Sequence, residues 1–305
     1  MTAILVSEVG PRDGLQSIKQ VMPLAAKKAW IAAEAAAGVR EIEVGSFVPP
    51  SLLPQMADTP ELVAFARTIP GLNVVALVPN AKGAERAVAA GAHAVSIPFS
   101  MSETHSLRNV RKDHPAMLAE IAEVARITSA AGVHFAVGLS TAFGCTIEGA
   151  VSEEQVVRLA AAAAEAGAQE FSLSDTTGYA DPAQVKRLIG KVRGAVGDQL
   201  TTLHLHNTRG LGLANALAGL EQGITTLDAS LGGLGGCPYA PGASGNLVTE
   251  DLVLMLNSMG LNTGIDLDKL LSVRQILIDA LPGEPLYGFT PDAGPMLDYA
   301  ERLAR

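Results

Sequence analysis

The sequence contains few aromatic residues and few cysteines. Aromatic side chains make up 4% of the 305 residues, with a single tryptophan, so we expect a core of Ala, Val, Ile and Leu. Cys145 and Cys237 are the only cysteines, and the chain opens without a basic, apolar signal segment. These features predict reduced thiols rather than a disulfide framework, and a cytoplasmic location.

Charged residues are also scarce, at 17%, and acidic residues outnumber basic ones by 31 to 22. The net charge of −9 disfavours nucleic acid or an anionic membrane as a partner. No apolar run reaches the ~18 residues that a transmembrane helix needs. A hydrophobic content of 48% excludes a disordered chain, and 31 glycines argue against a long coiled coil.

Glycine is abundant at one kind of position. Seven Ala-rich stretches with a helical pattern end at a glycine that a short β-branched run follows, namely Gly38, Gly71, Gly91, Gly132, Gly167, Gly197 and Gly223. Glycine suits the left-handed position after a helix. Typical helices are predicted over Ser152–Ala166 and over Pro182–Arg193, the latter capped by Asp181.

The repeated unit predicts an α/β fold. With residues 4–10 as the first strand, eight strands alternate with helices, which favours a closed (β/α)8 TIM barrel. An open doubly wound sheet is the alternative, but no GxGxxG follows the first strand. We predict a catalytic barrel over residues 1–260, with branched aliphatic side chains filling its interior. Residues 261–305 form additional helices that cover the barrel or provide a dimer surface.

Catalytic residues of such barrels lie where strands end. His204 and His206 are two apart on the seventh strand, so both point into the barrel mouth, as ligands of a divalent metal would. A hydrogen-bonded pair of core histidines is an equal alternative. Asp13 and Arg12 lie in a glycine-flanked turn, where Asp13 can bind a metal and Arg12 can neutralise an oxyanion. A capping aspartate beside a solvated arginine is the alternative there.

Two further carboxylates and one loop complete the candidate site. Glu43 shares a strand face with Glu41 and is expected to orient an arginine, while Asp175 lies at the rim or caps the next turn. The loop over residues 231–246 has six glycines in sixteen residues, so its backbone can approach a ligand or close as a lid. Cys237 in this loop suits acid–base or nucleophilic chemistry, and Asn246 can complete a metal shell. Cys145 is expected to be a buried small hydrophobe.

Together these motifs resemble the 3-hydroxy-3-methylglutaryl-CoA lyase family, within a superfamily of metal-dependent lyases and Claisen-condensing enzymes. The resemblance covers nearly the whole chain. GLGGCPYAPGASGN is its most specific piece, and EVGPRDGLQ, SFVPP, LSDTTG and the HxH pair match in the same order.

The resemblance implies a set of functional residues. The implied ligands of Mg²⁺ or Mn²⁺ are Asp13, His204, His206 and Asn246. The implied catalytic residues are Arg12, Glu43, Asp175, His204 and Cys237. The implied substrate-binding residues are Gln16, Ser46, Ser172, Thr176, His105 and Arg108. The phosphates of coenzyme A are assigned to loop cations that include Lys19 and Lys82, with Arg111 and Lys112 beside Arg108.

The implied reaction cleaves the C2–C3 bond of 3-hydroxy-3-methylglutaryl-CoA, or a close analogue, to acetyl-CoA and acetoacetate. Such a reaction belongs to leucine catabolism and ketone-body formation. Asp175 or His204 would remove the hydroxyl proton, with Asp175 preferred because a ligating histidine has one nitrogen committed. Arg12 would stabilise the enolate and Cys237 would protonate it.

Some residues depart from the family pattern. HNTRG stands where the lyases have HDTYG, and Gly138 stands in place of a pocket tyrosine. The loop FSMSETHSLRNVR reads partly like that of the condensing enzymes. These departures leave three alternatives: a lyase for a longer 3-alkylglutaryl-CoA or for citramalyl-CoA, a condensing enzyme related to isopropylmalate synthase, and a non-catalytic binding barrel.

Overall fold

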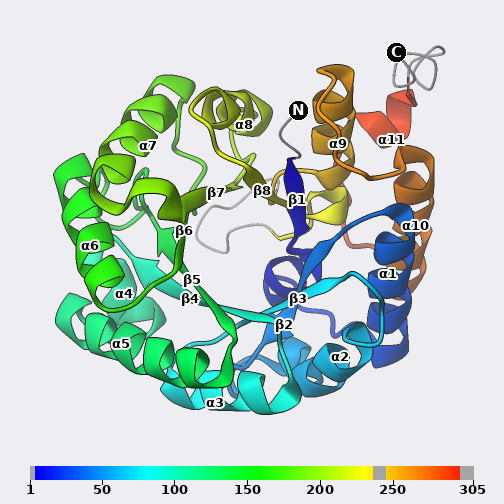
Figure 1. Cartoon of the computed structure of the whole chain (residues 1–305). Coiled ribbons are helices and arrows are strands. Elements are labelled where there is room, and N and C mark those ends of the chain that lie inside the picture. Colours follow the sequence, from blue (N-terminus) through cyan, green and yellow to red (C-terminus); the bar gives the residue numbers. More distant parts are fainter. Residues whose placement is uncertain (1–3, 236–244, 296–305) are drawn as a thin grey trace.

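The computed structural model describes residues 4–235 and 245–295 of the chain. Its strands pair in parallel in chain order, and β8 pairs with β1, so the sheet closes into a barrel (Figure 1). The strands are β1 Leu5–Glu8, β2 Glu41–Ser46, β3 Asn73–Leu77, β4 Ala94–Ser100, β5 His134–Ser140, β6 Glu170–Asp175, β7 Leu200–Leu205 and β8 Thr226–Ala229. The predicted (β/α)8 barrel is confirmed.

Helices surround the barrel on its outer side (Figure 1). The α-helices are α1 Leu24–Ala37, α2 Thr59–Ala66, α3 Ala81–Ala90, α4 Glu103–Asn109, α5 His114–Ala131, α6 Glu153–Glu165, α7 Pro182–Val196, α8 Gly212–Glu221, α9 Thr249–Ser258, α10 Leu267–Ala280 and α11 Thr290–Ala293. One π-helix, η1 Gly10–Gly14, and the 3-10 turns η2 Pro54–Met56, η3 Gly197–Gln199 and η4 Leu231–Gly233 complete the set. Ser152 and Asp181 cap α6 and α7 as the sequence indicates, and α7 runs to Val196.

All seven predicted junction glycines have positive φ, between 60° and 110°. This backbone conformation is costly for a residue with a Cβ, so glycine is what lets each helix end and turn back into the sheet. Gly38, which ends α1, has the further constraint that a Cβ there would overlap the carbonyl oxygen of Gly264.

The apolar core lies between the strands and the helices. Outward-facing strand residues such as Ile42, Val74 and Val95 are fully buried there. Few aromatics are available, and those present fill large gaps: Trp30 on α1 and Phe99 on β4 are both fully buried. Aliphatic packing outside the barrel therefore holds the strands in place.

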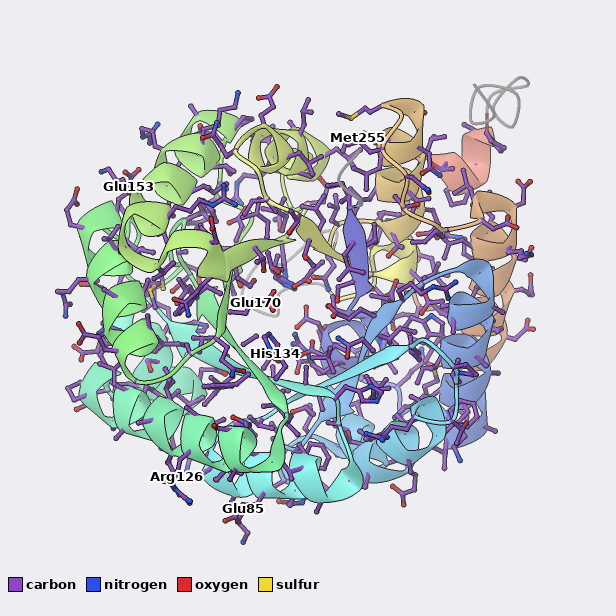
Figure 2. All side chains as sticks on the ribbon, in the orientation of Figure 1. Glu85, Arg126, His134, Glu153, Glu170 and Met255 are labelled. Carbon is purple, nitrogen blue, oxygen red and sulfur yellow. The ribbon has the colours of Figure 1, made fainter. Side chains whose placement is uncertain are left out.

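The barrel interior is a cavity with a mixed lining, so our prediction of an interior filled with branched aliphatic side chains is wrong. Val75, Leu77 and Ile97 line it together with small and polar side chains from all eight strands, among them Ser7, Glu41, Asn73, Ser96, His134, Glu170, Ser172, Thr202, His204 and Asp228. Figure 2 shows His134 and Glu170 within the ring of strands, whereas Glu85 and Arg126 project from the outer helices. The inner groups satisfy one another, since Asn73 donates to Glu41 at 2.7 Å and His134 lies 2.7 Å from Glu170.

The segment after residue 260 packs on the barrel's outer layer. Helix α10 lies along α1, and the Asp266 N–H donates to the carbonyl of Ala37 at 2.7 Å. Further on, the Tyr287 N–H donates to Gly232, so this segment also contacts the turn after β8. The division at residue 260 stays a prediction. None of the helices within residues 4–235 and 245–295 is long and apolar enough to cross a membrane.

The glycine argument predicts different costs at two junctions. Gly38→Ala should lose about 3 kcal/mol of folding free energy, because a left-handed alanine is combined with a clash against Gly264. Gly71→Ala is the matched control: its φ is also positive but no atom lies within 4 Å of the added Cβ, so it should lose about 1 kcal/mol. Urea unfolding of both variants measures the difference, and equal losses would contradict the packing argument.

Candidate metal centre and active site

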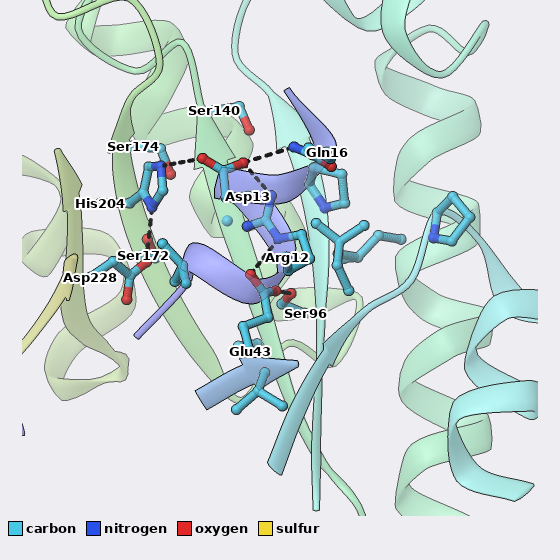
Figure 3. Close-up of a pocket in the computed structure, with 18 of the residues that line it drawn as sticks. Arg12, Asp13, Gln16, Glu43, Ser96, Ser140, Ser172, Ser174, His204 and Asp228 are labelled. Atoms are coloured by element: carbon cyan, nitrogen blue, oxygen red, sulfur yellow. Dashed lines mark hydrogen bonds and ion pairs between the residues drawn. The ribbon is translucent and has the colours of Figure 1, made fainter. Parts of the chain in front are cut away.

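Three predicted ligands meet at the carboxyl end of the barrel. The Oδ2 atom of Asp13 lies 3.8 Å from Nε2 of His204 and 3.8 Å from Nε2 of His206, and the two Nε2 atoms are 3.2 Å apart. Figure 3 shows Asp13 facing His204 across the pocket. Within the described residues, these three side chains form a group that could hold a metal ion.

The local backbone explains this convergence. Directly after β1, the Val9 carbonyl accepts the N–H groups of Arg12 and Asp13, which winds residues 10–14 into the π-helix η1. The turn carries both side chains over the barrel mouth. His204 lies on β7 between the buried Leu203 and Leu205, and His206 comes directly after the strand, where it forms an isolated β-bridge with Asn246.

The donor set fits a divalent cation. Ligands about 2.1 Å from a metal and at right angles to one another lie about 3 Å apart. The two histidine nitrogens, 3.2 Å apart, are close to this spacing, whereas Asp13 Oδ2 lies farther off, 3.8 Å from each of them. Burial lowers the pKa of His206 to about 4, so its ring is neutral and keeps a lone pair for a metal at neutral pH. Burial alone would raise the pKa of Asp13, but the charges of Arg12 and His204 lower it, so Asp13 stays anionic.

Asn246 has an unsatisfied oxygen beside this cluster. Its Nδ2 donates to Asp13 at 2.9 Å and to the Leu234 carbonyl at 3.0 Å, whereas the buried Oδ1 has no hydrogen-bond partner. The amide nitrogen therefore faces Asp13, and the oxygen would face it only if the two ends of the amide were exchanged, which would give up both hydrogen bonds. The role of Asn246 as a fourth protein ligand stays a prediction.

Asp228 is a site residue that the sequence analysis missed. It faces inward from β8 in register with His204, and its Oδ2 lies 3.1 Å from the His204 Nδ1. Burial opposes charge on His204, but this hydrogen bond and the charge of Asp13 raise its pKa. A carboxylate on the second ring nitrogen fixes the orientation of a ligating histidine. The alternation TLDA on the eighth strand was the available signal.

Arg12 is held rigidly at the pocket. Its Nε donates to Oε2 of Glu43, and its Nη1 donates to Asp13. Ser96 donates to the other oxygen of Glu43 at 2.6 Å (Figure 3). Glu43 therefore orients the arginine, as its predicted role requires, and the guanidinium is preorganised to face developing negative charge.

The cavity around these groups has a volume of about 870 Å³, within the range of small-molecule sites. Of the residues predicted to bind substrate or its phosphates, those that line it are Gln16, His105, Arg108, Arg111, Lys112, Ser172 and Thr176. Lys112 is paired with Glu120. Ser46, Lys19 and Lys82 do not line this cavity; Ser46 is buried against Val48 and Thr59.

Asp175 has a different environment from the one its proposed base role needs. Its carboxylate accepts the N–H groups of Tyr179 at 2.8 Å and Ala180 at 3.1 Å, and it is not among the cavity-lining residues. Burial raises its pKa to about 6. In this structure Asp175 caps the turn after β6, the alternative that the sequence analysis left open.

The structure tests the prediction for one of the two cysteines. Cys145 is free and buried, with 1% exposure, as expected for a small hydrophobe. Cys237 lies outside the described residues, which stop at Gly235 and resume at Gly245. Its catalytic role therefore stays a prediction.

Comparison with known proteins places these features in a family context. The HMGL-like family model matches residues 3–277. The mitochondrial hydroxymethylglutaryl-CoA lyase of Mus musculus is 41% identical over 278 residues, which cover 91% of this chain and 86% of that protein. The (R)-citramalyl-CoA lyase of Chloroflexus aurantiacus is 41% identical over 314 residues, which cover 100% of this chain and 99% of that protein.

A solved structure also matches closely. An HMG-CoA lyase from Acinetobacter baumannii, in complex with coenzyme A and 3-methylmalate, is 41% identical and superposes with a TM-score of 0.91. The match covers 97% of this chain and 96% of that one.

The metal assignment predicts opposite results for two histidines of the same barrel. His206→Ala should reduce bound Mn²⁺ to background, because it removes one ligand from the cluster. His134→Ala removes an imidazole from the other end of the barrel, where it pairs with Glu170, and should leave metal content unchanged. Elemental analysis of both purified variants measures this; stoichiometric metal in His206→Ala would contradict the ligand assignment.

Proposed function

Since the chain belongs to the HMGL-like family and is a carbon–carbon lyase, we propose that it cleaves the C2–C3 bond of 3-hydroxy-3-methylglutaryl-CoA, or of a close analogue, to acetyl-CoA and acetoacetate. The family resemblance and the lyase class expected from the sequence are confirmed. The observation that carries the substrate proposal is the juxtaposition of a rigid Arg12 with the Asp13–His204–His206 cluster in one cavity.

Arg12 and the Asp13–His204–His206 cluster each have a role in the proposed reaction. A divalent cation, Mg²⁺ or Mn²⁺, held by Asp13, His204, His206 and Asn246 would supply Lewis acidity at the substrate hydroxyl. The guanidinium of Arg12 faces the thioester oxygen and stabilises the enolate as the bond breaks. Glu43 holds that guanidinium in place, so no reorganisation is needed when the charge develops.

The proton steps are assigned to two kinds of group. His204 lines the cavity and Asp175 does not. The proposed metal takes Nε2 of His204, however, and its Nδ1 is hydrogen-bonded to Asp228, so His204 has no free nitrogen to accept the hydroxyl proton. The general base therefore stays a prediction between the two candidates named from the sequence. We assign protonation of the enolate to Cys237, from the glycine-rich segment after η4.

Coenzyme A requires local cations in an acidic protein. Arg108 and Arg111 line the mouth of the cavity and are assigned to its phosphates. Lys19 and Lys82, also assigned to phosphates from the sequence, are not cavity-lining and have weaker support. The similar protein from Acinetobacter baumannii was solved with coenzyme A, which supports an acyl-CoA substrate class here.

Citramalyl-CoA or a longer 3-alkylglutaryl-CoA is the second candidate substrate. The inner wall is open beside Gly138, where an added Cβ would meet no atom nearer than 3.9 Å. The full-length similarity to a citramalyl-CoA lyase favours the same alternative. A condensing activity is the remaining option within the superfamily. A cytoplasmic location, a homodimer and the absence of nucleic-acid or membrane partners stay predictions.

A substrate panel tests the proposal. The Mn²⁺-loaded protein is incubated with 3-hydroxy-3-methylglutaryl-CoA, a 3-ethyl homologue and both enantiomers of citramalyl-CoA, and acetyl-CoA release is followed. We expect the highest kcat/KM with 3-hydroxy-3-methylglutaryl-CoA. A higher value with citramalyl-CoA would replace the first candidate by the second. Free thiol from acetyl-CoA and a keto acid would instead indicate the condensing reaction.

The protonation step predicts different results for the two cysteines. Cys237→Ala should lower kcat by about 10²- to 10⁴-fold, the usual contribution of a general acid, with metal content unchanged. Cys145→Ala, at a buried position away from the cavity, is the matched control and should keep its turnover. Steady-state kinetics measures both, and near-normal turnover of Cys237→Ala would show that another group delivers the proton.

A further inference from the structure

A buried group of carboxyls lies on the outer side of β1, away from the cavity. Its neighbour Ser7 lines the cavity, so Glu8 points to the outer side of β1, where Thr249 at the start of α9 and Glu34 on α1 are its neighbours. Its carboxylate accepts three kinds of hydrogen bond: from the Gly10 N–H at 2.8 Å, from the Leu231 N–H at 3.0 Å, and from the Thr249 hydroxyl at 2.7 Å. One carboxylate thus joins the starts of η1, η4 and α9.

Each of these three attachment points lies next to a segment of the site. Residue 10 begins the π-helix that carries Arg12 and Asp13. Residue 231 begins the turn that leads from β8 into the glycine-rich segment, and residue 249 comes shortly after Asn246. The position of Glu8 therefore sets the relative placement of segments that bear the arginine and two of the four proposed ligands.

A second carboxyl faces Glu8 from the helix side. Glu34 on α1 is fully buried, and neither of its oxygens makes a hydrogen bond of ordinary geometry. Its electrostatic neighbours are the Glu8 carboxyl and the Trp30 indole. Nothing in the sequence pattern of α1 requires a carboxylate at this inward position, which packs among Trp30, Ile31 and Ala35.

Other charged groups near this pair do not neutralise it. Glu250 on α9 also faces the pair, and it is already paired with Arg274 of α10 at 2.6 Å. Its carboxylate also accepts the Gly232 N–H at 3.0 Å. Arg274 is therefore committed to Glu250, and Glu8 and Glu34 must share the remaining site without a cation of their own.

Two buried carboxyls in contact cannot both be charged at neutral pH. Glu8 already receives three donors, so it is the partner that suits the anionic form. Glu34 has the Trp30 indole as its neighbouring donor, at no ordinary hydrogen-bond geometry, so it suits the protonated form, whose O–H can donate to Glu8. Burial raises the pKa of Glu8 to about 7, and burial together with the charge of Glu8 raises that of Glu34 well above the usual range.

We propose that Glu34 is a positioning residue, which in its protonated form donates a hydrogen bond to Glu8 and so fixes the π-helix that carries Arg12 and Asp13 and the turn that follows β8. The pair exchanges one proton with solvent and involves no other covalent change. The catalytic readout of this inference rests on the proposed lyase activity, whereas metal affinity and the pH dependence of unfolding do not.

The proposal has a definite sign for stability against pH. A carboxyl whose pKa is raised on folding gives its full stabilisation below the unfolded value, near 4.5, and loses it as the pH rises through the folded value. The wild-type protein should therefore lose stability between about pH 5 and pH 8.5. An amide at residue 34 keeps a hydrogen-bond donor and removes the proton that this loss depends on.

Two variants distinguish the hydrogen-bond donor function of Glu34 from its titratable proton: Glu34→Gln keeps a donor but cannot titrate, and Glu34→Leu has neither. Glu34→Gln should keep kcat and Mn²⁺ affinity within about two-fold of wild type. Between pH 6 and pH 8.5 the Tm of this variant should fall by about 4 °C less than the Tm of the wild-type protein. Glu34→Leu lacks the donor, and should lower kcat about ten-fold with KM nearly unchanged, together with weaker Mn²⁺ binding. Glu85→Gln, an exposed carboxyl on α3, is the control and should match wild type in every measurement.

The outcomes that overturn the proposal are separate from those that overturn the lyase function. An unchanged pH dependence of Tm in Glu34→Gln would show that Glu34 holds no proton of consequence. Wild-type kcat and Mn²⁺ affinity in Glu34→Leu would show that the donor does not position these segments. If the wild-type protein cleaves no acyl-CoA, the Tm and Mn²⁺ measurements still decide the role of Glu34, and only the proposed function fails.

Discussion

The carboxylate of Asp13 is the point on which the site depends. It is hydrogen-bonded to Arg12, to Gln16 at 2.8 Å and to Asn246 at 2.9 Å, and it faces both histidines. A single anion thus joins residues that are far apart in the sequence: Arg12 after β1, the histidines at the end of β7, and Asn246 after β8. Its charge is kept by the surrounding cations despite burial, which would otherwise favour the neutral acid. Removing it would take away the anion between Arg12 and the two imidazoles, and would leave Arg12 with Glu43 and His204 with Asp228 as their carboxylate partners.

The features that could be predicted from sequence are those that local chemistry determines. Helix ends that need positive φ require glycine, so the seven junctions and hence the barrel follow from spacing alone. Alternation on β7 likewise places His204 and His206 together. Asp228 was missed because its role depends on the register between β7 and β8, which places it opposite His204. The sequence indicates that these strands are neighbours but not how far one is shifted along the other. Asp175 shows the converse, since a carboxylate after a strand can serve either a pocket or a turn, and only the backbone path decides between them.

The barrel interior could not be predicted from composition either. A general rule for these barrels is an interior of branched aliphatics, and a chain with 48% hydrophobic residues has enough of them to supply it. The alternation of most strands instead turns aliphatics outward and small or polar side chains inward, although Val75 and Leu77 of β3 also line the cavity. The acidic excess of the chain is partly located there, in Glu41 and Glu170 at the starts of β2 and β6, whereas Arg108 and Arg111 line the cavity from the segment after β4. The two ends of the cavity therefore differ in electrostatic character.

The polar inner wall has a consequence for how this scaffold can diverge. Residues such as Ala136, Gly138 and Ser172 border open space rather than packed core, so exchanging them changes the shape of the cavity without disturbing the aliphatic contacts outside. Folding stability and substrate range are thereby assigned to opposite faces of the same eight strands. Single substitutions on the inner wall should therefore change which ligand fits the cavity at little cost in folding stability.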